Sequence, residues 1–181
     1  MKSRNVWRVA AHIGVVVLAV SLGALAQTPT QVKFSGLIND FSPASVAPVG
    51  PWEVRGEWSL KLNGDSGTAD FSATLTMVRS DLWLILNSAD PNAPAARSAH
   101  THHITLVDGT VTPLANGFRV SGTGTVTASG NPAPFGESSP LQIDITGGNS
   151  VAFSNIKLTL GAPAAGHFGS QALNGVVRSS K

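Results

Sequence analysis

The sequence contains no cysteine and no tyrosine, and charged residues make up only 12% of its 181 residues. Without cysteine the chain has no disulfide framework and no site for the lipid of a lipoprotein. Low charge, together with abundant glycine, serine and threonine, favours strands and turns over helices. An exported chain without disulfides is typical of a bacterial periplasm or of a secreted bacterial product.

Residues 1–26 have the features of a cleavable secretory signal. A basic start precedes an apolar run over 13–25, which ends in the small-x-small pattern Ala24-Leu25-Ala26. The run is shorter than the ~20 residues that a membrane-spanning helix needs. We therefore predict cleavage before Gln27, export to the periplasm or the medium, and no membrane span after cleavage. An uncleaved membrane anchor is the alternative.

Removal of this segment changes the net charge. Three of the twelve lysines and arginines lie in it, which leaves nine basic against ten acidic residues and a net charge of −1 with histidine neutral. The sequence shows no basic run that would favour nucleic acid as a partner. Residues 27–181 have the length of one domain.

The clearest structural signal is the stretch Trp52 to Leu62, in which apolar or small residues alternate with polar ones at every position. A period of two over eleven residues predicts a strand with one buried and one solvated face. An Asn-Gly turn within 63–67 then leads to a second alternating run, 68–78. Residues 52–78 are therefore predicted to form an antiparallel hairpin.

The same reasoning predicts further strands at 31–39, 100–107, 117–128, 141–146, 151–160 and 168–177. Residues 82–86 are apolar at every position, which favours a strand buried on both faces, with a single helical turn as the alternative. A turn is expected at Asp108-Gly109 and a bulge near Ser154-Asn155, where the alternation changes parity. The longer connections, which hold most of the proline, are 41–51, 87–99, 129–140 and 161–166.

Eight or nine strands favour an all-β fold, a single closed antiparallel β-barrel in which the first strand pairs with the last. A β-sandwich is the alternative. Gly122 and Gly124 on the apolar face of 117–128 leave room that a tryptophan of 52–62 could fill. The plan is similar to the small up-and-down barrels of lipocalins and avidins, although neither family's motif is present.

Histidines are unevenly distributed. Three of the four that follow residue 26 lie in His100-Thr101-His102-His103. If Ile104 and Leu106 face the core, His100 and His102 share that face and His103 points away. Two imidazoles at this spacing are close enough to bind one metal ion, at about 2 Å from each nitrogen.

The third ligand of such a site would come from elsewhere in the chain. His167 is the remaining histidine, and Asp90 or Asp108 could supply a carboxylate. The site would then hold a divalent transition metal. The alternatives without a metal are a ligand-binding or catalytic role, a solvated patch, or buried histidines bonded to backbone carbonyls.

Other catalytic chemistries find less support. No Gly-x-Ser-x-Gly elbow and no HExxH motif is present. Glu53 and Glu57 flank Arg55 on a solvated strand face, which indicates a surface row of charges. Asn63, Asp65 and Asp70 could offer oxygens to calcium, but they do not follow the calcium-loop pattern.

Three functions follow from these features. The leading hypothesis is a non-enzymatic exported barrel that binds a small apolar or amphipathic ligand through His100, His102 and Trp58; core packing is the alternative role for Trp58. The second is a metal-dependent protein or enzyme that uses His100, His102 and His167. The third is a structural or adhesive surface module whose proline-rich loops contact a partner.

Overall fold

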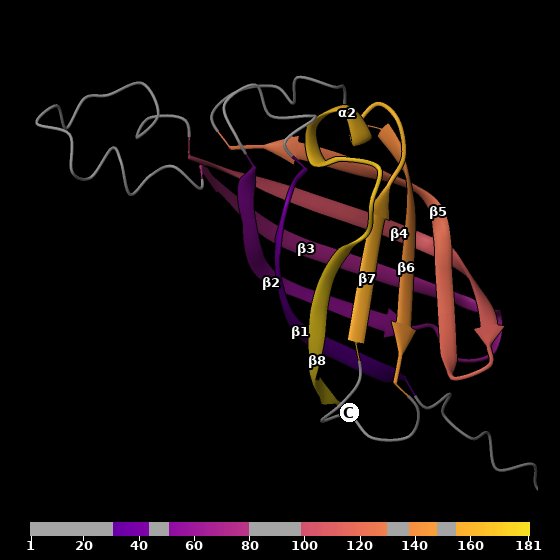
Figure 1. Cartoon of the computed structure of the whole chain (residues 1–181). Coiled ribbons are helices and arrows are strands. Elements are labelled where there is room, and N and C mark those ends of the chain that lie inside the picture. Colours follow the sequence, from indigo (N-terminus) through magenta and orange to yellow (C-terminus); the bar gives the residue numbers. More distant parts are fainter. Residues whose placement is uncertain (1–30, 44–50, 80–98, 130–137, 148–154) are drawn as a thin grey trace, which may run out of the picture.

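The computed structural model describes residues 31–43, 51–79, 99–129, 138–147 and 155–181 (Figure 1). They form a closed antiparallel barrel of eight strands in sequence order. The strands are β1 Val32–Phe41, β2 Trp52–Leu62, β3 Thr68–Arg79, β4 His100–Leu114, β5 Gly117–Ala128, β6 Ser138–Thr146, β7 Asn155–Leu160 and β8 Leu173–Ser180. The predicted closed barrel is confirmed, and the sandwich alternative is wrong.

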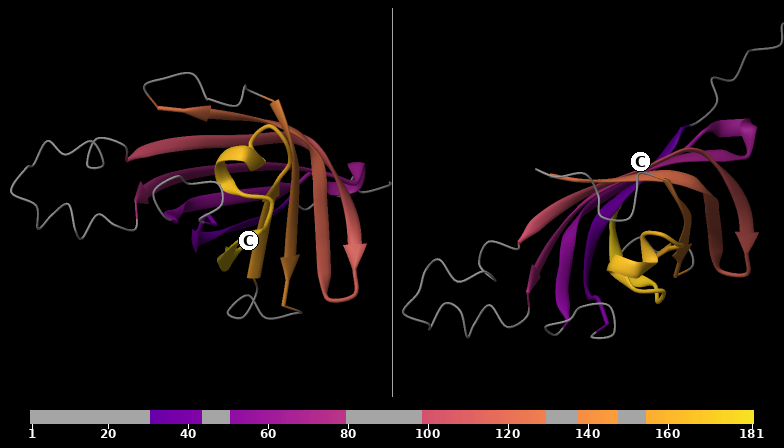
Figure 2. Two further views of the ribbon diagram at one scale, coloured as in Figure 1. Left: turned by 45° about the horizontal axis from the view of Figure 1, so that its top comes forward. Right: turned by 90° about the horizontal axis from the view of Figure 1, so that it is seen from above.

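Two short helical turns accompany the strands. A 3-10 turn, η1 (Gly64–Ser66), closes the β2–β3 hairpin, and α2 (Ala165–Phe168) lies between β7 and β8. Figure 2 shows α2 within the curve of the sheet, at one end of the barrel. None of the helical segments in the described ranges has the length and apolarity to cross a membrane.

The barrel closes where the first strand meets the last. Leu37 pairs with Val176 and Ile38 with Gly175. The strands approach so closely here that a Cβ on Gly36 would collide with the carbonyl oxygen of Val176. Pairing β1 with β8 removes both sheet edges, as the sequence predicted.

The interior is one apolar cluster to which all eight strands contribute. Alternate residues of the β2–β3 hairpin supply much of it, and Trp58 pairs with Ala73 and Leu60 with Phe71. The observed bounds of β2 and β5 match the predicted ones residue for residue. A regular period of two therefore located these two strands from sequence alone.

The predicted turn at Asp108-Gly109 is wrong, because β4 continues through it to Leu114. Asp108 has a positive φ of 52°, and the pairing with β5 shifts register between Thr105 and Thr110. The bulge changes which residues of β4 are buried. Just before it, every second residue up to Leu106 is buried, and the next buried residue is Gly109, three positions later. Aspartate and glycine are common in turns, but pairing with β3 and β5 keeps both residues within the strand.

The expectation that a tryptophan fills the space beside Gly122 and Gly124 of β5 is also wrong. A Cβ on Gly122 would lie 2.8 Å from Leu106 Cδ1, and one on Gly124 would collide with the side chain of Leu141. Neighbouring strands therefore fill this space. Trp58 instead lies against Gly36, whose added Cβ would be 3.0 Å from its ring.

The end of the chain differs from the prediction as well. The last strand begins at Leu173 instead of 168, because residues 165–168 form α2. β6 begins at Ser138, three residues earlier than predicted. The predicted signal segment 1–26, the predicted strand 82–86 and the predicted bulge near Ser154-Asn155 lie, wholly or in part, outside the described residues.

Candidate metal centre

Three histidines meet at the barrel end that carries α2. His100 and His102 lie on the core-facing side of β4, and His167 is the third residue of α2. His102 is fully buried, whereas His100 and His167 are partly exposed. The group therefore lies at the boundary between the core and the mouth of the barrel.

The Nε2 atoms of the three rings point to one position. His167 Nε2 lies 3.1 Å from His100 Nε2 and 3.0 Å from His102 Nε2. Three nitrogens bound to one tetrahedral zinc ion at about 2 Å would be separated by about 3.3 Å. The two separations from His167 are close to that value, and the ligand atoms of all three residues lie within 4.8 Å of one another, so a small shift would admit an ion.

A backbone carbonyl determines the tautomer of His102. The Nδ1–H of His102 donates to the oxygen of Thr127 at 3.3 Å, since a carbonyl can only accept. Neutral His102 therefore carries its lone pair on Nε2, the atom that faces His167. Metal-binding histidines commonly have their second ring nitrogen fixed by such a bond.

Electrostatics keep two of the rings neutral. Burial, followed by repulsion from His167 and His100, lowers the pKa of His102 to about 3. Burial, followed by repulsion from His100, lowers the pKa of His167 to about 4. At neutral pH both imidazoles are uncharged, which is the form that binds metal ions.

Hydrogen bonding alone fits this arrangement poorly. A ring nitrogen carries either one proton or one in-plane lone pair, and His167 Nε2 would have to serve two neighbouring nitrogens at once. A cation at the common position would accept a lone pair from each ring. The arrangement is thus chemically suited to binding one metal ion.

Local contacts hold α2 in place over the barrel end. Its preceding residue, Ala164, is buried and donates its backbone N–H to the hydroxyl of Ser139, which is also buried. At the other end, Gly169 has a positive φ of 95° and packs against Pro43. These anchors determine where His167 lies relative to β4.

Aromatic rings form the surroundings of the three histidines. Trp52 meets His100 edge-on at a centroid distance of 5.4 Å. Phe168 is buried and lies 4.8 Å from the ring of His102 and 5.2 Å from that of His167. Apolar walls lower the local dielectric constant and so strengthen interactions with a bound ion.

Sequence reasoning did not identify all of these neighbours. The sequence predicts a strand at Phe168, and it contains no signal for the carbonyl of Thr127. Trp52 does have a signal in the sequence, because it is the first residue of an alternating strand and lies on the apolar face of that strand. That strand start is fixed by Ser42, which donates its N–H to the carbonyl of Trp52 at 2.8 Å and accepts from its N–H at 3.0 Å.

The other candidate residues lie elsewhere. Asp108 is eight residues along β4, about 26 Å from His100, and its N–H donates to Asp70. His103 faces outward and contacts the hydroxyl of Thr74 at 3.2 Å.

Trp58 is buried in the core and stacks with Phe71. Asp90 lies outside the described residues.

Comparison with protein-family models, with curated proteins and with solved structures gives no match for this chain. Its fold class is that of a closed eight-stranded antiparallel β-barrel.

Proposed function

We propose that this protein binds a divalent transition metal ion through His100, His102 and His167. The observation that carries the proposal is the convergence of the three Nε2 atoms, two of them within 3.1 Å of the third. The neutral state of His102 and His167 at pH 7 supports it, since no proton has to be displaced from either.

The donor set favours some ions over others. Three imidazoles suit zinc, copper, nickel and iron, whereas magnesium and calcium prefer oxygen ligands. Among the described residues, the candidate metal-binding group consists of histidines alone. Zinc is the first choice, and copper(II) is expected to bind more tightly in vitro because of the general order of affinities.

A three-histidine site has chemical consequences. Three protein ligands leave a fourth tetrahedral position for water or another molecule, as in catalytic zinc sites. Zinc lowers the pKa of water bound there to near 7. The metal-dependent function proposed here therefore includes binding, and activation, of a fourth ligand at the mouth of the barrel.

The binding of a small apolar ligand inside the barrel is a weaker proposal. Side chains from every strand meet there in one core cluster, and Trp58 is 3% exposed within it. A ligand at the open position of the metal would instead face the partly exposed rings of His100 and His167. We therefore place ligand binding at the metal.

The test is metal titration of the purified chain after treatment with a chelator. We expect one zinc ion per chain in calorimetry, and a tetrahedral visible spectrum with cobalt(II). His100→Ala, His102→Ala and His167→Ala should each weaken binding by at least about tenfold. His103→Ala is the matched control, because this ring lies on the same strand but faces outward.

Two results would reject the metal site. One is retention of affinity and stoichiometry in the three variants. The other is an equal loss in His103→Ala. Because His102 is buried, its variant is also checked for folding by circular dichroism. His100→Gln and His167→Gln keep the test decisive if that variant unfolds, since both residues are partly exposed.

We also propose that the chain is exported after cleavage of residues 1–26. The support is the basic start, the apolar run and Ala24-Leu25-Ala26 in the sequence. Expression in a bacterial host, followed by amino-terminal sequencing of the periplasmic fraction, should give a chain that begins at Gln27. A full-length chain retained in the membrane fraction would contradict this proposal.

A further inference from the structure

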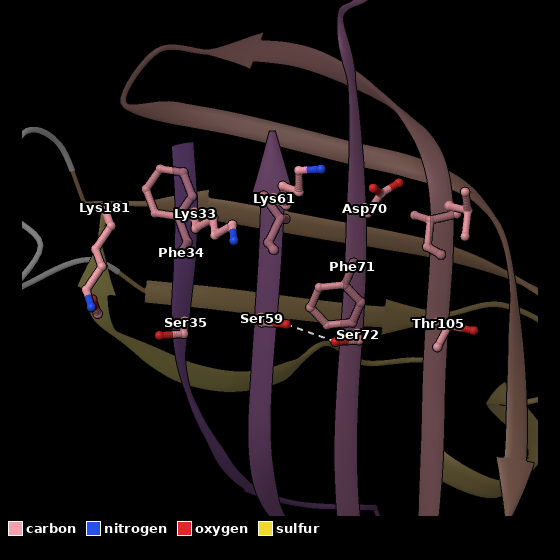
Figure 3. Close-up of a pocket in the computed structure, with 14 residues that line it drawn as sticks. Lys33, Phe34, Ser35, Ser59, Lys61, Asp70, Phe71, Ser72, Thr105 and Lys181 are labelled. Atoms are coloured by element: carbon pink, nitrogen blue, oxygen red, sulfur yellow. Dashed lines mark hydrogen bonds between the residues drawn. The ribbon is translucent and has the colours of Figure 1, made fainter. Parts of the chain in front are cut away.

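A groove of about 700 Å³ crosses the outer face of the barrel, away from the histidines (Figure 3). Its floor is a row of small hydroxyl side chains, one from each of five adjacent strands. In spatial order these are Ser179, Ser35, Ser59, Ser72 and Thr105, each paired with the next across the sheet.

Longer side chains stand beside this row. Two residues further along the strands, on the same face, Lys33 pairs with Lys61, and Lys61 with Asp70. Lys181, the residue after β8, exchanges two backbone hydrogen bonds with Lys33 and so extends the row. The groove therefore results from a row of short side chains next to a row of long ones.

The three lysines Lys33, Lys61 and Lys181 line the groove together with one carboxylate, that of Asp70, which pairs with Lys61 across the sheet. Like charges directly opposite one another on a sheet destabilise it. The ion pairs of Arg55 with Glu53 and of Arg119 with Asp144 include none of these lysines. Asp70 accepts the backbone N–H of Asp108 at 3.0 Å, which holds its carboxylate toward β4.

Positive charge thus gathers at one face of the barrel. Lys33, Lys61 and Lys181 line the main groove, and Arg178 lines the adjoining hollow with Glu57. Four of the chain's twelve lysines and arginines are in this region. Lys33 is on β1, Lys61 is on β2, and Arg178 and Lys181 lie on β8 and directly after it, so no basic run appears in the sequence. An anionic partner would relieve their mutual repulsion.

We propose that this groove binds a linear polysaccharide bearing carboxylate or sulfate groups. Five strands at about 4.8 Å spacing give a floor about 19 Å long, which suits an extended chain better than a single sugar. The hydroxyl row, in which Ser59 and Ser72 lie 2.9 Å apart, offers donors and acceptors to sugar hydroxyl groups. The lysines would bind the anionic groups along one side.

Nucleic acid fits this groove less well. Binding of single strands relies on exposed aromatic rings on which the bases stack. Phe34 and Phe71 alternate with the floor residues and point to the core side, where Phe71 is 2% exposed and Phe34 packs against Phe118. Both residues are among those that line the groove, but their rings pack against Phe118 and Trp58, so they do not form a row on which bases could stack.

The experiment is calorimetric titration of the whole chain with a polygalacturonate hexamer at low ionic strength. We expect saturable binding that weakens as salt is added. Replacing all three lysines (Lys33→Gln, Lys61→Gln and Lys181→Gln) should lower the affinity about a hundredfold, at a factor of about five for each cation near an anionic surface. Ser72→Gln, which fills the floor, should also abolish tight binding.

Lys157→Gln is the matched control, because Lys157 is exposed on β7, outside the groove. Three outcomes would overturn the proposal. They are no binding by the unaltered chain, an equal loss in the control, and tighter binding of an oligothymidylate of equal charge. His100→Ala should leave polysaccharide binding unchanged, since the groove shares no residue with the metal centre.

Discussion

The Nε2 atoms of His102 and His167 lie 3.0 Å apart although 65 residues separate them in the sequence. The first is on a barrel strand and the second is on the short helix between β7 and β8. A metal ion bound between them would link the helix to the sheet. Metal binding and stability of the fold should therefore be coupled.

Zinc is expected to raise the melting temperature of the chelator-treated protein. At free zinc one hundred times above Kd, binding contributes about 2.7 kcal/mol. For a domain of this size that corresponds to about 5 to 10 °C. Differential scanning calorimetry with and without zinc measures the shift. It should disappear in His167→Ala and persist in His103→Ala; an equal shift in both variants would contradict the coupling.

Acid should destabilise the metal-free protein. The pKa values of His102 and His167 are lowered to about 3 and about 4 in the folded state, against about 6.5 when unfolded. As pH falls below 6.5 the unfolded chain takes up protons that these folded histidines do not, so the free energy of unfolding falls. Above pH 6.5 the contribution of both residues to stability is intact. The loss then grows as the pH falls, down to about pH 4 for His167 and about pH 3 for His102, where the folded histidines also take up protons.

Urea unfolding at pH 7.5, 6.5, 5.5 and 4.5 measures this effect. Each histidine contributes at most about 1.4 kcal/mol per pH unit, and partial exposure of His167 reduces its share. His167→Ala should make the pH dependence shallower than in the unaltered chain. A stability that is flat or that rises between pH 7 and 4.5 would show that the two rings are protonated in the folded state.

Most of the barrel could be predicted because its strands alternate. The hairpin of β2 and β3, the strand β5 and the pairing of β1 with β8 all follow from a period of two and from the need to remove sheet edges. The bulge at Asp108 could not, because it depends on register with β3 and β5. Its residues alone favour a turn.

The candidate site was predictable only in part. The alternation of their strand predicts that the side chains of His100 and His102 point inward. His167 is a candidate third ligand in the sequence only because it is the one histidine after residue 26 that lies outside the 100–103 cluster. Its position depends on a helix of four residues, which has no hydrophobic period to reveal it. The groove with the three lysines combines residues from five strands, including the first and the last, so only the closed fold brings them together.

The indole of Trp58 provides a test of the core. Its Nε1 is buried with no hydrogen-bond partner among the described residues, and the side chain is 3% exposed. Trp58→Phe removes a buried unsatisfied donor along with some volume, so it should cost no more than about 1 kcal/mol. Trp58→Ala should cost about 3 to 5 kcal/mol, because it leaves a large cavity.

Urea unfolding of the two variants provides the comparison. If Trp58→Phe costs as much as Trp58→Ala, the indole N–H forms an interaction in solution with water or a ligand inside the barrel. That outcome would favour the interior ligand site over the closed core.

Gly169 should matter more for metal binding than its neighbour Gly166. Gly169 has a φ of 95°, and an added Cβ would lie 2.5 Å from Pro43, whereas a Cβ on Gly166 would meet nothing within 4 Å. Gly169→Ala is therefore expected to displace the end of α2 and to weaken zinc binding by about tenfold, with a stability loss of about 1 to 3 kcal/mol. Gly166→Ala should leave both nearly unchanged. Calorimetric titration with zinc compares the variants, and equal affinities would show that the backbone at Gly169 does not determine where His167 lies.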